Sequence, residues 1–282
     1  MAPTTSHIGV CSWSLQPVSP KDLVQKLMST GLPCVQLALA PLRRGEWDVE
    51  ETEQRLSDEG LGVVSGMMSM AGEDYSTLDS IRITGGLRPD AHWKSNLVSA
   101  GECARLASRL KLDLISFHAG FLPHDRSDPE REVLLDRLRK VVDVFAEEGV
   151  HVALETGQET ADTLLDVLAD IDRPTAGVNF DPANMLLYGM GDPVLSLDRL
   201  ARHVKQIHVK DAHRSAQPGS WGEEVPVGTG EVDWKAFFEL VSERLPGVNL
   251  LIEREAGADR IGDVRTASAL LGNHGFHDRS TP

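Results

Sequence analysis

The chain alternates between short apolar runs and longer amphipathic stretches, and the alternation repeats eight times. The runs predicted as strands are rich in β-branched residues, and Gly, Pro and Asp mark the loops and helix ends between them. They cover residues 7–13, 34–39, 61–68, 112–120, 150–155, 175–181, 204–210 and 248–253. Eight strand–helix units predict an α/β fold, and specifically a closed (β/α)8 TIM barrel.

The main alternative is an open parallel sheet with helices on both faces. A nucleotide-binding sheet of that kind carries a Gly-rich turn after its first strand, and the segment after residues 7–13 has none. The length of 282 residues fits one barrel, and no linker or low-complexity segment divides it. We therefore expect a single domain over residues 1–282, in which about residues 273–282 form a polar tail.

The composition limits the partners and the compartment. With 43 acidic and 28 basic residues the formal net charge is −15, which opposes binding to nucleic acid and to anionic lipid. The N-terminal segment lacks the features of a signal peptide, and no apolar run approaches the ~20 residues of a membrane helix. Cys11, Cys34 and Cys103 have no CxxC spacing, so we interpret them as reduced, buried residues of a cytoplasmic protein.

Four apolar runs in the C-terminal half each reach a residue that can bind a metal ion. These residues are Glu155, Asp181, His208 and Glu253. The first three follow one another at intervals of 26 and 27 residues, about one strand, one helix and their loops. Because the carboxyl ends of barrel strands meet at one face, we expect the four side chains to converge there. Three carboxylates and one imidazole suit a divalent cation that prefers oxygen and nitrogen ligands.

Further residues near the strand ends are candidates for substrate binding. His118 ends the fourth strand and could hydrogen-bond a hydroxyl or carbonyl group, or be a buried structural histidine. Lys210 shares a strand face with His208 and could polarise a carbonyl group, or form an ion pair with Asp211. Trp13, at the end of the first strand, could stack on a sugar ring or pack in the core.

The motifs around these residues resemble those of the sugar phosphate isomerase/epimerase group, which has a xylose isomerase-like barrel. The resemblance covers nearly the whole chain and rests on the segments ALETGQET, NFDPANM, IHVKDA, PVGTGEVDW and LLIERE. It implies that Glu155, Asp181, His208 and Glu253 hold one catalytic divalent ion, often Mn²⁺, Mg²⁺ or Co²⁺ and sometimes Zn²⁺. It also implies that Glu155 and Glu253 are an acid/base pair on opposite faces of the substrate.

Two positions differ from the ketose epimerases of this group. Those enzymes carry a histidine three residues after the metal-binding aspartate, where this chain has Asn184. Many members have a glutamate in the second strand, where this chain has Gln36. Both positions are expected to contact the substrate, so the resemblance does not identify it. The related DNA-repair endonucleases need several further histidines, of which only His118 has a counterpart here.

The resemblance and the ligand set together predict an isomerase or epimerase of a sugar or sugar-like polyol, acting in carbohydrate metabolism. Such an enzyme removes a proton next to a carbonyl group and passes through a metal-stabilised enediolate. A lyase or dehydratase acting on a keto-sugar, keto-inositol or 3-keto-glycoside shares this first step and is an alternative. A protein that binds metal and sugar without turnover is an alternative from another class. The expected partner is a small carbohydrate, with neither nucleic acid nor membrane, and homo-oligomerisation is left open.

Overall fold

The fold is a closed barrel of eight parallel strands, seen in a computed structural model that describes residues 6–217 and 219–278. Around the barrel the strand order is β1-β10-β7-β6-β5-β4-β3-β2. The barrel strands are β1 (Ile8–Cys11), β2 (Cys34–Ala38), β3 (Gly62–Met67), β4 (Leu114–Phe117), β5 (His151–Glu155), β6 (Ala176–Phe180), β7 (Val204–Val209) and β10 (Asn249–Ile252). The prediction of a single TIM barrel is therefore confirmed.

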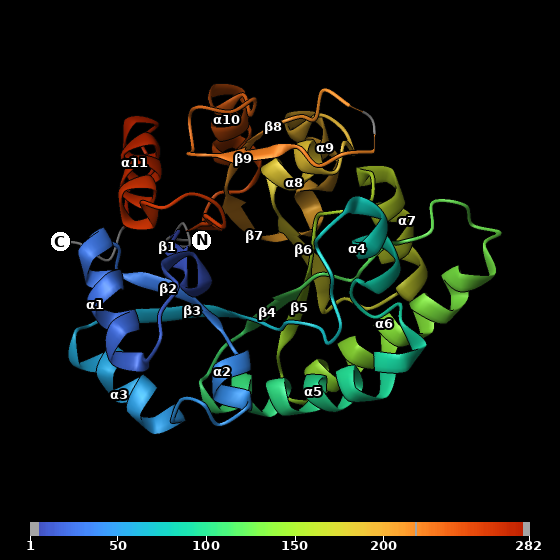
Figure 1. Cartoon of the computed structure of the whole chain (residues 1–282), viewed down its shortest axis with the longest axis horizontal. Coiled ribbons are helices and arrows are strands. Elements are labelled where there is room, and N and C mark those ends of the chain that lie inside the picture. Colours follow the sequence, from blue (N-terminus) through green and yellow to red (C-terminus); the bar gives the residue numbers. More distant parts are fainter. Residues whose placement is uncertain (1–5, 218, 279–282) are drawn as a thin grey trace.

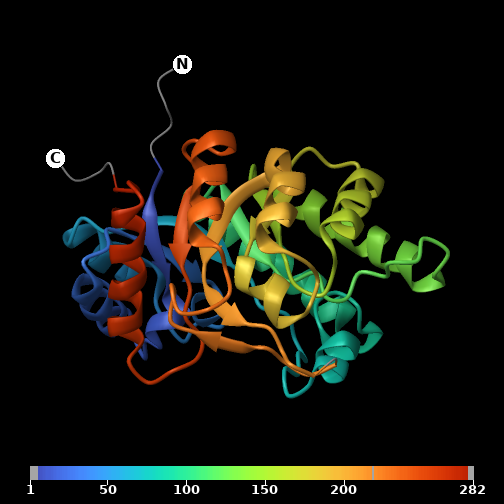
Figure 2. The same ribbon diagram turned by 90° about the horizontal axis from the view of Figure 1, so that it is seen from above.

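Helices surround the barrel and connect its strands (Figure 1). They are α1 (Pro20–Thr30), α2 (Ala40–Arg43), α3 (Val49–Asp58), α4 (Leu78–Thr84), α5 (Asp90–Arg109), α6 (Pro129–Glu147), α7 (Ala161–Ile171), α8 (Pro182–Leu187), α9 (Pro193–Leu200), α10 (Trp234–Arg244) and α11 (Arg260–Asn273). Helix α1 has a favourable start, since Ser19 Oγ accepts a hydrogen bond from Asp22 N at 3.2 Å and Pro20 is the first helical residue. Helices α1 and α11 come from opposite ends of the chain and pack side by side, which closes the helical layer (Figures 1 and 2).

Side chains of each strand alternate between the helical layer and the barrel interior. On β6, the Phe180 ring lies 6.0 Å from the Phe237 ring of α10, whereas Asn179 hydrogen-bonds inside the barrel. The interior contains buried polar side chains rather than a wholly apolar packing. They are Gln36, Ser65, Ser116, Asn179 and Gln206. Their hydrogen bonds to one another and to the site above them satisfy these buried groups.

Two long segments between predicted strands contain short regular elements. The segment 69–90 includes α4, and the segment 212–232 includes most of an antiparallel pair formed by β8 (Asp211–His213) and β9 (Glu223–Val225). These elements are too short and too polar to give a clear periodic pattern. Both follow the carboxyl ends of barrel strands, and Figure 2 shows them at the same end of the barrel.

The two ends of the described chain meet at the opposite end of the barrel. Helix α11 ends at Asn273, and Ile8 N donates a hydrogen bond to Asp278 Oδ2 at 3.0 Å. The remainder of the predicted tail, residues 279–282, and the first five residues lie outside the described ranges. The three cysteines are buried free thiols. Within residues 6–217 and 219–278, every helix is too short or too polar to cross a membrane.

Candidate metal centre and active site

The four predicted metal ligands converge at the carboxyl end of the barrel. Glu155 is the last residue of β5, His208 lies in β7, and Asp181 and Glu253 directly follow β6 and β10. These strands are neighbours in the barrel, and one ligand atom from each residue lies within 4.8 Å of the other three. No more than 3% of any of the four residues is exposed. This buried cluster of acidic groups and one imidazole could bind a metal ion.

Asp181 uses its two carboxylate oxygens differently. Oδ1 caps α8, where it accepts hydrogen bonds from Ala183 N at 2.8 Å and Asn184 N at 3.1 Å. Oδ2 is buried, and no described residue hydrogen-bonds it. Burial raises the pKa of Asp181 to about 8, although Lys210, with Nζ 3.7 Å from Oδ2, opposes this rise. An unsatisfied buried oxygen is costly, so Oδ2 fits the position of a ligand to a cation.

Hydrogen bonds behind His208 determine which ring nitrogen faces the carboxylates. Gln36 Nε2 donates to Ser116 Oγ at 2.7 Å, so Gln36 Oε1 is the atom that lies 2.7 Å from His208 Nε2. His208 therefore donates a hydrogen bond from Nε2. Its Nδ1 lies 3.4 Å from both Glu155 Oε1 and Glu253 Oε2. In the neutral ring, Nδ1 then carries the lone pair that a metal ion requires.

Glu155 is held by an amide and lies near two imidazoles. Asn184 Nδ2 donates a hydrogen bond to Glu155 Oε1 at 3.2 Å, and His118 Nε2 lies 3.6 Å from the same oxygen. Burial acts to raise the pKa of Glu155, but His118 and His208 together hold the pKa below its ordinary value. The carboxylate form, which both a metal ligand and a base require, is thus favoured.

Glu253 is held by an indole and an ammonium group. Trp13 Nε1 donates a hydrogen bond to Glu253 Oε1 at 2.6 Å, and Lys210 Nζ donates to Oε2 at 2.9 Å. Burial acts to raise the pKa of Glu253, but Lys210 and His208 outweigh it and hold the pKa well below its ordinary value. Lys210 also donates to Glu255 Oε2 at 2.5 Å. Lys210 therefore provides positive charge next to the cluster.

A cavity of about 470 Å³ opens next to the ligand cluster. Four of the five predicted substrate-binding residues line it, namely Trp13, His118, Asn184 and Lys210. Gln36 does not, because it is fully buried behind His208 and holds that ring from inside the barrel. The sequence alone does not distinguish a residue that faces the cavity from one that lies behind His208, since either can come from β2.

Asp211 anchors the loop that carries the PVGTGEVDW motif. Its Oδ2 accepts hydrogen bonds from Gly228 N at 2.9 Å, Gly230 N at 3.0 Å and Trp234 Nε1 at 2.8 Å. A Cβ atom at Gly230 would lie 2.1 Å from Asp211 Oδ1, so a larger residue does not fit there. The carboxylate of Asp211 thus organises this loop, while Lys210 pairs with the two glutamates instead.

Several residues of the cavity wall were not singled out as site residues from the sequence. Glu73 and Tyr75 lie between β3 and α4, Tyr188 follows α8, and Trp221 lies between β8 and β9. All four belong to segments that follow the carboxyl ends of strands, where the active sites of barrels lie. That rule identifies the segments. It does not identify which residues within a long polar segment turn toward the cavity.

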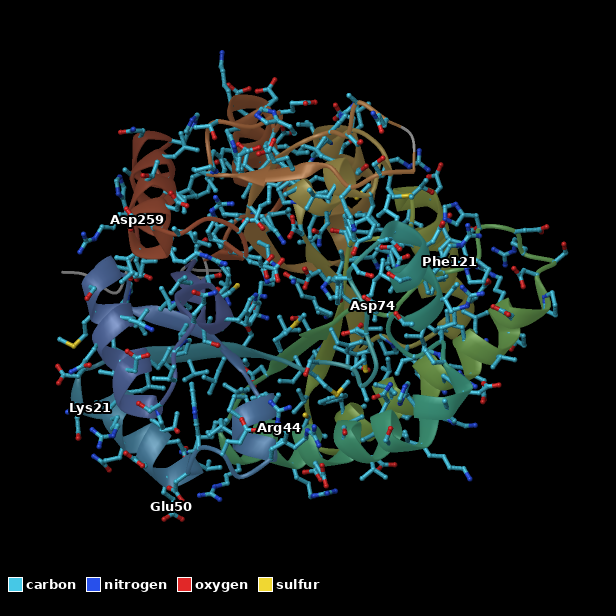
Figure 3. All side chains as sticks on the ribbon, in the orientation of Figure 1. Lys21, Arg44, Glu50, Asp74, Phe121 and Asp259 are labelled. Carbon is cyan, nitrogen blue, oxygen red and sulfur yellow. The ribbon has the colours of Figure 1, made fainter. Side chains whose placement is uncertain are left out.

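The loops after β3 and β4 pack against each other at the edge of the cavity. Leu87 N donates a hydrogen bond to Ala119 O at 3.0 Å, and a Cβ atom at Gly86 would lie 2.1 Å from that oxygen. Gly86 also has a φ of +63°, which favours glycine. Figure 3 shows Asp74 and Phe121, one from each loop, near α4. This contact holds the segment of Glu73 and Tyr75 next to His118.

A family model described as a xylose isomerase-like TIM barrel matches residues 24–273, which is most of the chain. The chain belongs to this family. The xylose isomerase domain protein from Planctomyces limnophilus, a solved structure, is 31% identical and superposes with a TM-score of 0.85 over 96% of this chain and 97% of that one. A D-allulose 3-epimerase from Methylomonas sp. has the same fold, with a TM-score of 0.73 and 15% identity over 96% and 99% of the two chains.

The 3-dehydroshikimate dehydratase from Bacillus anthracis is a further relative. It is 30% identical over 126 residues, which are 43% of this chain and 45% of the dehydratase. The match therefore spans less than half of that enzyme. Proteins similar to this xylose isomerase-like barrel thus include both a sugar epimerase and a dehydratase.

Proposed function

We propose that the protein is a divalent-metal-dependent enzyme that removes a proton next to the carbonyl group of a sugar or sugar-like polyol. The observation that carries the proposal is the convergence of four buried ligands, with Asp181 Oδ2 unsatisfied by the described residues. Glu155, Asp181 and Glu253 would hold the ion through carboxylate oxygens, and His208 through Nδ1. When bound, such an ion polarises a carbonyl group and stabilises negative charge on its oxygen. The ligand set suits Mn²⁺, Mg²⁺ or Co²⁺, and Zn²⁺ is compatible with it.

Glu155 and Glu253 are the proposed acid and base. They reach the cluster from β5 and β10, with β7 and β6 between them, so a substrate carbon over the cluster would lie between two carboxylates. One glutamate takes the proton, and the electron pair of the broken C–H bond forms the C=C bond of an enediolate. The other glutamate can return a proton. Return to the same carbon gives an epimer. Return to the neighbouring carbon, with the hydroxyl proton moving from one oxygen to the other, gives an aldose–ketose isomer.

The remaining residues of the site bind the substrate or position the two glutamates. His118 and Lys210 line the cavity next to Glu155 and Glu253, respectively, and would hydrogen-bond substrate oxygens. Trp13 and Asn184 also line the cavity, and their hydrogen bonds orient the two glutamates. These contacts keep each carboxylate in a fixed direction, which proton transfer to a bound carbon requires.

A dehydratase or lyase is the second candidate, and the likeness to 3-dehydroshikimate dehydratase favours it. Its first step would be the same proton removal. The enolate would then lose a leaving group from the neighbouring carbon, and a protonated side chain would supply the proton to that group.

Solvent exchange tests this proposal. Protein loaded with Mn²⁺ would be incubated in D₂O with ketoses, keto-inositols and 3-keto-glycosides, and the products followed by NMR. Deuterium next to the carbonyl group supports an enolising enzyme, and a new unsaturated product supports the lyase. Chelator-treated protein should show neither signal, and Glu155→Gln and Glu253→Gln should each form product at least about 100-fold more slowly. Glu243→Gln changes an exposed glutamate on α10 and should behave as the unmodified protein. Absence of both signals with every compound would contradict catalysis and favour a binding protein.

A further inference from the structure

The mouth of the barrel is divided into two chemically different halves. The metal ligands come from the four adjacent strands β5, β6, β7 and β10. The opposite strands β2 and β3 contribute Ala38 and Met67 to the cavity, and the residues that follow them contribute Ala40 and Met68. Carboxylates, an imidazole and an ammonium group thus lie on one side, and an apolar wall lies on the other.

The cavity is larger than one sugar ring requires. Its volume is about 470 Å³, whereas a hexose occupies on the order of 200 Å³ if each of its heavy atoms takes little more than half of the ~30 Å³ of a liquid water molecule. Leu187 at the end of α8 and Trp221 between β8 and β9 add apolar side chains from the segments that follow β6 and β7, on the side of the metal ligands. A sugar over the ligand cluster would therefore leave room for a second group in contact with apolar side chains.

The charges around the cavity disfavour an anionic ligand. Of the described residues that line it, Lys210 is the only lysine or arginine, and it already donates to Glu253 and Glu255. Glu73 adds a further carboxyl group to the wall. Arg254, next to Glu253 in the sequence, is turned to Glu224 and Asp263 at 2.7 and 2.8 Å. Away from the ligand cluster and His118, a phosphate or carboxylate on the substrate would thus meet the carboxyl groups of Glu73 and Glu255 and no unpaired arginine or lysine among these residues.

Trp221 packs against Tyr188 at the edge of the cavity. Its ring centroid lies 4.8 Å from that of Tyr188 in an edge-to-face arrangement. Within the described ranges, Trp221 Nε1 and Asp181 Oδ2 are the two buried side-chain polar atoms without a hydrogen-bond partner. Asp181 Oδ2 belongs to the metal cluster, and Trp221 belongs to the cavity wall. Because the indole nitrogen is buried, the rest of the Trp221 ring is what meets the cavity.

From these observations we propose that the substrate is an uncharged carbohydrate that carries an apolar substituent. The sugar lies over Glu155, Asp181, His208 and Glu253. The substituent, such as an aromatic ring, lies against apolar side chains that line the cavity from both sides, namely Met67, Met68, Leu187 and Trp221. This inference rests on the proposed function for the position of the sugar. It goes beyond that function in the charge and the shape of the substrate.

Binding of glycosides that lack a reactive carbonyl group tests this inference without turnover. Phenyl and methyl β-glycosides of glucose, galactose and mannose would be titrated into Mn²⁺-loaded protein by calorimetry. Burial of the ring against the apolar wall should make a phenyl glycoside bind about 10- to 100-fold more tightly than its methyl counterpart. Phenyl β-D-glucuronide, which adds one carboxylate, should bind at least about tenfold more weakly than phenyl β-D-glucoside.

Two tryptophan variants connect the preference to the proposed wall. Trp221→Ala should reduce the phenyl-to-methyl ratio to below about 5-fold while it still binds Mn²⁺, which shows that it is folded. Trp93→Ala removes a tryptophan of α5 that packs on Arg137 outside the cavity, and it should leave the ratio unchanged. Equal binding of phenyl and methyl glycosides, or no binding of any, would overturn the inference that the substrate carries an apolar substituent. Tight binding of the glucuronide would overturn the inference that the substrate is uncharged. Deuterium exchange with unsubstituted ketoses would uphold the proposed function in either case.

Discussion

Replacement of Gln36 tests how the barrel interior prepares the metal centre. Gln36 is fully buried, and its Oε1 accepts the proton of His208 Nε2 at 2.7 Å. Gln36→Leu removes this acceptor with little change in side-chain volume. An unsatisfied buried N–H group costs about 1–3 kcal/mol, and the ring can avoid this cost by turning Nδ1 away from the carboxylates. That energy corresponds to about a 5- to 150-fold loss in metal affinity, in the range typical for partners of metal ligands.

Gln36→Glu is the matched control. A glutamate at this position keeps an acceptor for His208 Nε2, and Ser116 Oγ can donate to it. Its affinity for Mn²⁺ should stay within about tenfold of the unmodified protein. Competition titration with a fluorescent chelator measures both variants, and circular dichroism checks that each is folded. If Gln36→Leu binds Mn²⁺ as tightly as the unmodified protein, then His208 is not oriented by this hydrogen bond and the assignment of Nδ1 is refuted.

Further changes test the ligands, the acid/base pair, a buried carboxyl group and the partners. Asp181→Ala should abolish tight Mn²⁺ binding in calorimetry, and unchanged affinity would contradict the ligand set. Glu155→Gln and Glu253→Gln should each lose at least about 100-fold in turnover while retaining some metal; near-full proton exchange in either would make that residue a ligand only. Burial raises the pKa of Glu159 from 4.5 to about 7. The free energy of unfolding should therefore fall as the pH rises from the ordinary pKa of a glutamate through about 7. Glu159→Gln should flatten this fall by up to about 3 kcal/mol, and parallel urea-unfolding profiles between about pH 5 and about pH 8 would contradict it. An abasic DNA duplex should be neither bound nor cleaved at physiological salt, given the net charge of −15.

The sequence was sufficient for the barrel because each unit carries its own signals. Strand runs, the helix start at Pro20, and the regular spacing of Glu155, Asp181 and His208 are local patterns that survive in the fold. The convergence of these residues follows from the geometry of any closed parallel barrel. Sequence reasoning therefore predicted the cluster before any distance was known, although which metal it binds stays a prediction.

The rest of the site depends on contacts between distant segments. Whether Gln36 faces the cavity or lies behind His208 is decided by the strand register around the barrel, and it lies behind. The positions of Tyr75 and Trp221 depend on how long polar segments fold over the barrel mouth. Composition and periodicity contain little information on either, because many loop conformations suit the same polar sequence.

The most direct test of the metal centre is a crystal structure of the protein grown with Mn²⁺, with the ion located by anomalous scattering. One peak per chain is expected, at about 2.0–2.3 Å from His208 Nδ1, Asp181 Oδ2 and carboxylate oxygens of Glu155 and Glu253. Gln36 should remain hydrogen-bonded to His208 Nε2. A peak at another site, coordination through His208 Nε2, or no peak at saturating Mn²⁺ would contradict the proposed metal centre.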